Sequence, residues 1–239
     1  MNFYIIILTV IVIILVYLLY RFFSNSGKSL ASNVYLKNVN NTPIAMSNSS
    51  TRYAYGLWIY VNSLAPTNPT MIISRCNSVP NYSNATKLPT NSSMALYLDN
   101  TSTLKLDISQ SCAAETSATS AISITTNFPF QKWCYVMFCT DGQYVDCYID
   151  GKLVKSVVLN CLIKGPDTTT DNVYLGGNSI SDINIAKLQY WSHPLSPQEV
   201  WSNYLRGNGT NMLSNLFASY GFGVSLFKNN VEVSNTRVF

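Results

Sequence analysis

The stretch that decides the fold is Trp133–Val154, with the sequence WCYVMFCTDGQYVDCYIDGKLV. Its pairs Asp141-Gly142 and Asp150-Gly151 predict tight hairpin turns, because Asp and Gly tolerate a positive φ. If Asp141 and Gly142 are the two loop residues, alternate residues of the flanking strands share an apolar face, which predicts antiparallel strands packed on a core. The members of this face are Cys134, Val136, Phe138, Val145, Cys147 and Ile149. The opposite face carries Tyr135, Met137, Cys139, Tyr144, Asp146 and Tyr148.

The same register constrains three of the six cysteines. Cys139 points away from Cys134 and Cys147, so it cannot bridge either of them. Cys134 and Cys147 are diagonal neighbours, about 7–8 Å apart, which is beyond the reach of a disulfide. We therefore predict that these three are buried free thiols. The remaining three lie near predicted loops, and their redox state stays open: Cys76, Cys112 and Cys161.

Strand patterns continue on both sides of the hairpin, separated by turn residues at intervals of roughly ten, which is typical of an all-β sandwich or barrel. The predicted strands are Arg52–Asn62, Met71–Cys76, Met94–Asp99, Thr103–Ser109, Ala121–Thr126, Lys132–Thr140, Gln143–Asp150, Lys152–Leu159, Asn172–Leu175 and Ile183–Trp191. Two polar stretches, Asn77–Ser93 and Ser111–Ser120, are predicted to be long loops.

One helix is well marked after the last of these strands. Ser196-Pro197-Gln198-Glu199 forms a capping box with Pro at the first helical position. The helix should end near Arg206, with Gly207 as the stop signal. A second short helix is predicted over Asn211–Ser219, and a β-hairpin follows in Gly221–Phe227 and Val231–Val238.

Taken in order, the motifs of this region resemble the laminin-G-like domains of the concanavalin A-like superfamily. They are Trp133, the Asp141-Gly142 turn, Tyr148-Ile149-Asp150-Gly151-Lys152, Tyr174-Leu175-Gly176-Gly177-Asn178 and Leu195-Ser196-Pro197-Gln198-Glu199. The resemblance implies an all-β fold, a two-sheet antiparallel jelly-roll sandwich over residues 34–207. An extension over residues 208–239 should pack on or near the sandwich.

The N-terminal segment predicts a membrane anchor. Phe3–Tyr20 carries no charge, and as a helix it would rise roughly 27 Å, close to the hydrocarbon thickness of a bilayer. We predict a transmembrane helix over residues 1–21 and a linker over 22–33. A cleaved signal peptide is the less favoured alternative, because no Lys or Arg precedes the apolar run. Residues suited to the interfaces are Phe3, Tyr4, Tyr17, Tyr20 and Arg21.

Flanking charge predicts the orientation of this anchor. Arg21, Lys28 and Lys37 lie on its C-terminal side, and the N-terminal side offers only the α-amino group. The positive-inside rule therefore predicts a cytoplasmic domain. The seven N-x-S/T sequons do not decide the compartment, since a chain so rich in Asn, Ser and Thr contains several by chance.

The sequence argues against several kinds of chemistry. A glycosidase needs two nearby carboxyl groups, and the three glutamates lie far apart, at Glu115, Glu199 and Glu232. We therefore predict a protein that is not an enzyme and has neither a cofactor nor a metal centre, although loop oxygens near Asp167 and Asp171 could hold calcium. A zinc site is not favoured, because the chain has no C-x-x-C motif and only one histidine, His193. Nucleic-acid binding is not favoured either, because the lysines and arginines are scattered.

Two functional hypotheses remain. The whole chain resembles membrane-anchored virion proteins of large DNA viruses, which implies a structural protein that links an internal membrane to capsid or minor capsid proteins. The alternative is a lectin-like glycan-binding or attachment protein, which would need an outward domain and oxidised loop cysteines. In either case the outward tyrosines Tyr135, Tyr144 and Tyr148 are the predicted partner or glycan surface. The tryptophans could also stack on sugars, but core or subunit contacts are more typical: Trp58, Trp133, Trp191 and Trp201.

Overall fold

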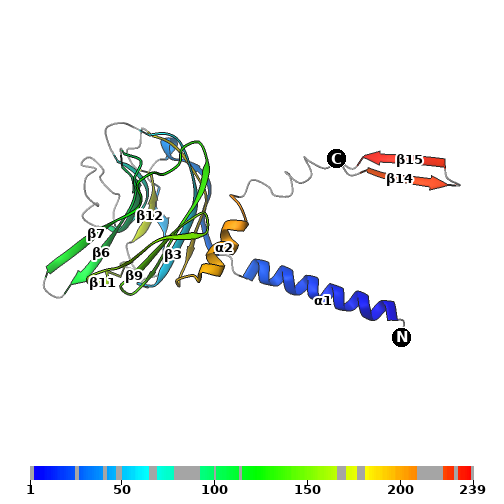
Figure 1. The fold of residues 1–239 in the computed structure, drawn as a ribbon, viewed down its shortest axis with the longest axis horizontal. Helices are drawn as coiled ribbons and strands as arrows, with labels where there is room; N and C mark the ends of the chain where they lie inside the picture. The colour runs from blue at the N-terminus through cyan, green and yellow to red at the C-terminus, as the bar shows by residue number, and fades with distance from the viewer. Residues whose placement is uncertain are drawn as a thin grey trace.

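Two antiparallel sheets pack face to face in the computed structural model (Figure 1). It describes residues 3–24, 27–39, 42–46, 50–64, 69–77, 92–99, 101–112, 115–165, 171–176, 181–208, 223–228 and 231–237. Sheet A contains, in spatial order, β1 (Lys28–Tyr35), β13 (Asp182–Trp191), β3 (Tyr53–Ser63), β8 (Trp133–Asp141), β9 (Tyr144–Ile149) and β10 (Lys152–Val158). Sheet B contains β11 (Leu162–Ile163), β6 (Leu104–Cys112), β5 (Ser92–Leu98), β4 (Thr70–Cys76), β12 (Asn172–Leu175) and β2 (Ile44–Ala45), and β7 (Glu115–Thr125) pairs with β6. A 3-10 turn, η1 (Leu36–Asn38), follows β1.

The core lies between the sheets and is built by alternate residues of their strands. Leu57 and Ile59 of β3 and Phe138 of β8 are fully buried, as are Leu96 and Leu106 of the facing sheet. Each such side chain contributes roughly 1.5–3 kcal/mol by leaving water. The predicted all-β sandwich is therefore confirmed, and its strands lie close to the predicted ranges.

The central hairpin keeps its predicted faces but not its predicted register. Asp141 pairs with Tyr144, so the loop residues are Gly142 and Gln143, and Phe138 lies opposite Cys147. The left-handed φ of +65° falls on Gly142, the residue that adopts it most readily. The shift equals two residues, and because strand side chains alternate with period two, no side chain changes face. At the far edge of the sheet, β10 carries a register irregularity between Leu153 and Lys155.

Two predicted irregular segments are strands. The linker predicted over residues 22–33 is wrong from Lys28 onward, because β1 pairs with β13 along the edge of sheet A. Its polar side chains are exposed while Leu30, Ala31 and Val34 pack on the core, so the sequence lacks a strong apolar pattern. The loop predicted over residues 111–120 is also wrong, since β6 extends to Cys112 and β7 begins at Glu115.

The cysteines divide into one pair and four free thiols. Cys112 and Cys161 form a disulfide with their Cα atoms 5.3 Å apart, which resolves two of the three positions left open by the sequence. The free thiols are all buried: Cys76, Cys134, Cys139 and Cys147. The three hairpin cysteines are thus free and buried, as predicted. Burial raises the pKa of each, to about 11 for Cys134 and about 12 for Cys139 and Cys147.

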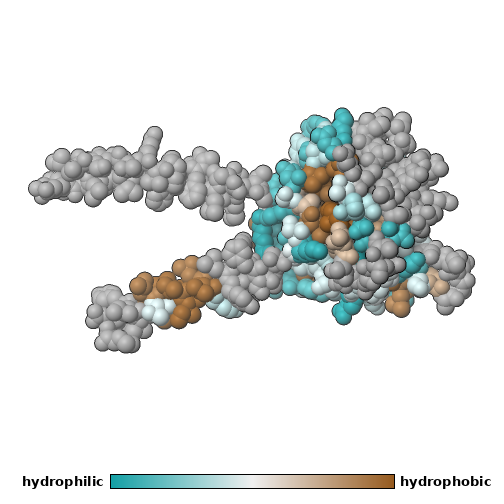
Figure 2. Space-filling view, turned by 180° about the vertical axis from the view of Figure 1, so that it is seen from behind, coloured by the Kyte–Doolittle hydropathy of each residue, from teal (hydrophilic) through white to brown (hydrophobic). Residues whose placement is uncertain are grey.

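Helix α1 (Phe3–Ser24) contains the apolar N-terminal run. Side chains are described over residues 7–17, where the large apolar ones are between 43% and 63% exposed. Figure 2 shows this part as an apolar stretch standing away from the sandwich. Within the described part of the chain, no helix is long and apolar enough to cross a membrane. The anchor over residues 1–21 and its interfacial residues stay predictions.

The C-terminal hairpin forms as predicted, from β14 (Gly223–Lys228) and β15 (Val231–Arg237). Figure 1 shows it extending from the sandwich on the same side as α1. The short helix predicted over 211–219 lies outside the described residues. Packing of the extension on the sandwich therefore stays a prediction.

Candidate functional site

Helix α2 (Pro197–Leu205) builds one wall of the site, and its boundaries follow from the predicted caps. Ser196 N donates to Glu199 Oε2 at 2.9 Å, and Glu199 N donates back to Ser196 Oγ at 3.4 Å. Arg206 caps the other end, and Gly207 follows with a φ of +68°. These contacts satisfy backbone groups that a helix start leaves without partners.

The helix lies against the outer face of sheet A and closes a second apolar cluster there. This cluster comprises Ala54, Trp58, Tyr135, Met137, Cys139, Tyr148, Ala186, Trp191, Leu195 and Val200. The predicted outward tyrosine surface is therefore wrong in two of its three residues. Tyr135 and Tyr148 are each only 2% exposed, whereas Tyr144 is 59% exposed. Burial raises the pKa of Tyr148 to about 12. Strand periodicity identified the correct face but not the helix that covers it.

A groove lies beside this cluster, where three segments distant in sequence meet. It has a volume of about 640 Å³ and is open to solvent. Its lining comes from β7 and the loop after it (Ile124, Thr125, Asn127, Pro129), from the β9–β10 turn (Ile149, Asp150, Lys152, Val154) and from α2 (Trp201, Tyr204). The groove is thus a concave site built from strand, turn and helix residues.

Trp201 is the prominent aromatic side chain of this groove, and it is 40% exposed. The turn backbone supports it from one side, since a β-carbon at Gly151 would lie 2.6 Å from Trp201 Cε3. Tyr204 supports it from another side, with ring centroids 5.3 Å apart, and Tyr204 in turn stacks on Trp58 at 5.6 Å. The indole is therefore held by neighbouring groups while a large part of its surface stays available.

Asp150 has a structural role at the edge of the groove. Its Oδ1 accepts a hydrogen bond from Tyr135 N at 2.9 Å, and its own N–H donates to Tyr135 O at 2.8 Å. Its Oδ2 lies 3.7 Å from Lys132 Nζ. These contacts fix the left-handed backbone of the turn, in which Asp150 has a φ of +48° and Gly151 a φ of +76°. The carboxylate is thus already engaged.

Among the described residues, the other titratable side chains form no recognisable catalytic or metal centre. Burial raises the pKa of the Asp107 carboxyl to about 6, and the Tyr97 hydroxyl donates to it at 3.2 Å. Asp171, one of two loop residues considered for calcium although no metal centre was predicted, is buried with its Oδ2 3.8 Å from Arg75 Nε, and Asp167 lies outside the described residues. No group of three metal-binding side chains occurs in the part of the chain that is described.

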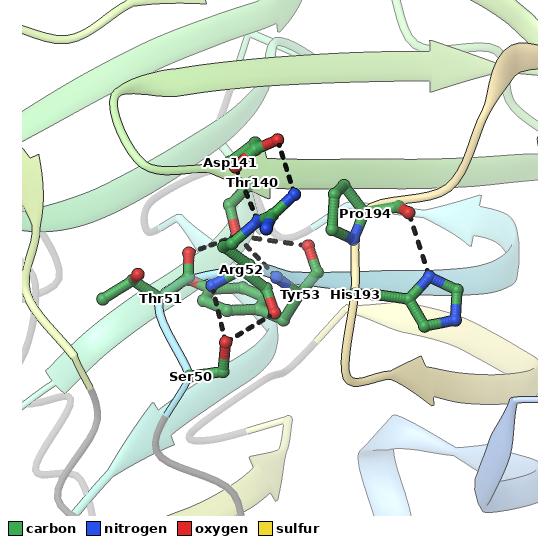
Figure 3. A network of polar contacts seen from close by, with 8 residues as sticks. All are labelled: Ser50, Thr51, Arg52, Tyr53, Thr140, Asp141, His193 and Pro194. Carbon is green, nitrogen blue, oxygen red and sulfur yellow. Dashed lines mark hydrogen bonds and ion pairs between the residues drawn. The ribbon is translucent and has the colours of Figure 1, made fainter.

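A second polar network surrounds the opposite end of the hairpin (Figure 3). Arg52 Nε lies 2.7 Å from Asp141 Oδ1, and Thr140 Oγ1 accepts from Tyr53 N at 3.1 Å. These contacts join the start of β3 to the end of β8. Figure 3 shows His193 beside them with its own local contact, Nδ1 to the carbonyl oxygen of Pro194 at 3.0 Å. The network is therefore structural.

Residues 31–201 match the family model Laminin_G_3, the concanavalin A-like lectin/glucanases superfamily. The chain belongs to this superfamily. The match covers more than half of the chain and agrees with the jelly roll predicted from the hairpin and turn motifs. A search of curated proteins found no match for this superfamily member.

Several solved structures are similar to this superfamily member. A mutant of HCR/D has 16% identity and a TM-score of 0.51, over 74% of this chain and 46% of that chain. The botulinum neurotoxin type G receptor-binding domain has 15% identity and a TM-score of 0.48, over 75% and 45%. A Trypanosoma rangeli sialidase has 14% identity and a TM-score of 0.44, over 67% and 24%. The chain therefore spans less than half the length of each of these structures. They give no support to the predicted virion role, which stays a prediction.

Proposed function

We propose that this chain is a non-enzymatic, membrane-anchored glycan-binding protein, and that a saccharide binds in the groove between α2 and the β9–β10 turn. The observation that carries the proposal is the fixed but accessible indole of Trp201. A pyranose ring has an apolar C–H face that stacks on such a surface, and a preformed aromatic platform loses little conformational entropy on binding.

The other groove residues suit the hydroxyl groups of a sugar. Asn127 is exposed and offers both amide donors and a carbonyl acceptor, and Thr125 and Lys152 add a hydroxyl and an ammonium group. A mainly apolar groove with a few polar groups at its rim is the common form of a small-molecule site. Membership of a superfamily described as lectins and glucanases is consistent with this proposal.

Hydrolysis of the bound saccharide is not part of the proposal. Cleavage of a glycosidic bond uses two carboxyl groups roughly 5–10 Å apart. Among the described residues that line the groove, Asp150 is the one carboxylate, and it accepts from Tyr135 N and lies near Lys132. Glu199 serves the helix cap instead. The groove therefore suits binding better than catalysis.

The disulfide supports an outward-facing domain, because Cys112 and Cys161 would pair stably in an oxidising compartment. This differs from the cytoplasmic orientation predicted from Arg21, Lys28 and Lys37. We favour the outward orientation, since three flanking charges are a small bias and glycans are displayed outside the cytoplasm. Helix α1 would hold the domain at the membrane, where its exposed apolar side chains would meet lipid. No feature of the groove favours the alternative role as a virion linker.

The direct test is a glycan microarray probed with the full-length chain in a neutral detergent. We expect selective binding by the wild type and roughly tenfold weaker binding by Trp201→Ala, because an aromatic contact contributes about 0.5–1.5 kcal/mol beyond area burial. Tyr144→Ala is the matched control, since Tyr144 is exposed but does not line the groove. Equal binding by Trp201→Ala and the wild type would refute the groove, and no binding by the wild type would refute the function.

A further inference from the structure

We infer that the groove selects an acidic saccharide, with the carboxylate or sulfate of the sugar paired to the ammonium group of Lys152. This inference rests on the proposed function, because it assigns a ligand class to the same groove. Its basis is the juxtaposition in one groove of the accessible indole of Trp201, which packs on Gly151, and the next residue, Lys152, which has no carboxylate partner among the described residues.

Three carboxylates of the elements around the groove are engaged by other groups: Asp146, Asp150 and Glu199. Asp150 accepts from Tyr135 N and lies 3.7 Å from Lys132 Nζ. On β9, Asp146 Oδ1 accepts from Ser156 Oγ at 2.6 Å. On α2, Glu199 is held by the capping turn. Each interaction satisfies an acidic group locally, so none of these carboxylates forms an ion pair with Lys152.

Lys152 is exposed, and its ammonium group makes no ion pair or hydrogen bond with the described residues. It lines the groove, and it directly follows the glycine against which Trp201 packs. The rim of the groove consequently has an excess of positive charge, because Lys132 already offsets Asp150. A sugar that stacks on Trp201 would bring a ring substituent near the Lys152 ammonium group. An anionic substituent there gains a charge-assisted contact that a hydroxyl cannot match.

Lys155 provides the matched control. It lies on the same strand, is exposed, and makes no ion pair with the described residues, but it does not line the groove. Replacing either lysine by glutamine removes one positive charge from β10. A general electrostatic effect would therefore respond equally to both substitutions, whereas a specific contact would respond to Lys152→Gln alone.

The experiment measures affinity by biolayer interferometry, with the full-length chain in neutral detergent. Three immobilised trisaccharides are compared: one with a neutral terminal hexose, its 6-sulfated form, and one with a terminal hexuronic acid. We expect at least one acidic form to bind roughly three- to tenfold more tightly than the neutral form, as for a partly exposed charged contact. Lys152→Gln should remove this advantage and Lys155→Gln should keep it. Raising the ionic strength to about 1 M, where the Debye length is about 3 Å, should also reduce it.

The outcomes separate the two proposals. A preference for one acidic trisaccharide would identify sulfate or carboxylate as the source of the charge. Equal affinity for all three sugars, unchanged in Lys152→Gln, would overturn the inference, and the proposed function would stand if Trp201→Ala still weakened binding. Equal losses in Lys152→Gln and Lys155→Gln would also overturn it, in favour of a diffuse charge effect. No binding of any of these sugars, together with a blank glycan microarray, would overturn both proposals.

Discussion

Replacing Gly151 by alanine tests the contact that fixes the groove indole. A β-carbon there would lie 2.6 Å from Trp201 Cε3 and 3.2 Å from Tyr204 Cβ, while the backbone φ is +76°. The left-handed conformation costs a residue with a β-carbon about 1–2 kcal/mol. Overpacking adds about 1–3 kcal/mol. We therefore expect Gly151→Ala to lower the free energy of unfolding by about 2–5 kcal/mol and the melting temperature by roughly 5–20 °C.

Gly207→Ala is the control for this substitution. Gly207 has a similar φ of +68°, but a β-carbon there would meet nothing within 4 Å. It should therefore show the backbone cost alone, about 1–2 kcal/mol. Thermal and urea unfolding of the full-length chain would give the difference between the variants, and acrylamide quenching of tryptophan fluorescence would report displacement of the indole. Equal destabilisation by the two variants, with unchanged quenching and unchanged glycan binding, would refute the idea that the turn holds Trp201.

Tyr148→Ala should destabilise the fold by about 3–5 kcal/mol because its ring is buried under α2, whereas Tyr144→Ala should stay within about 0.5 kcal/mol; urea unfolding of both variants checks the pair. The raised pKa of Asp107, about 6, means that its neutral form is favoured in the folded state, so its stabilising effect should be complete below the unfolded pKa and be lost as pH rises through about 6. Asp107→Asn should flatten that pH dependence in unfolding measurements, and an unchanged profile would contradict the assignment. Reducing the Cys112–Cys161 bridge, which has a sequence separation of 49 residues, should cost about 4 kcal/mol, and without reductant an unfolded-state thiol assay should detect only four cysteines. In sealed membrane vesicles of known orientation, we expect a C-terminal tag on the outward side and glycosylation of the Asn208 sequon. A tag on the cytoplasmic side, with no glycan on the chain, would contradict the proposed topology.

Local signals in the sequence identified much of the architecture. The capping box at Ser196–Glu199 and the glycine at position 207 set the ends of α2 because these effects act within one helical turn. The apolar alternation of the hairpin assigned its inner and outer faces correctly, although Asp141 pairs with Tyr144 rather than forming part of the loop. Strand side chains alternate between the two faces of the sheet, so a register error of two residues leaves every side chain on its predicted face.

Features that depend on tertiary contacts could not be predicted from the sequence. Tyr135 and Tyr148 are outward on their strands, but α2 covers them, and nothing in the strand pattern specifies where a later helix docks. The groove combines β7, the β9–β10 turn and α2, whose residues are separated by up to 80 positions, from Ile124 to Tyr204. Gly151 was the one sequence signal for the groove. It forms part of the Asp150-Gly151 turn, and because it has no β-carbon, Trp201 can pack closely against it.

The irregular edge strand β10 has a consequence for molecules held side by side on a surface. A straight, uncharged edge strand with Leu153, Val154 and Val158 exposed could form backbone hydrogen bonds with the same strand of a neighbouring molecule. The two sheets would then form one continuous sheet. The break in pairing between Leu153 and Lys155 bends this edge, and the lysines at 152 and 155 make two such edges repel each other. Many copies could therefore crowd together as separate domains, and aggregation through continuous β-sheet would be suppressed at the edge nearest the groove.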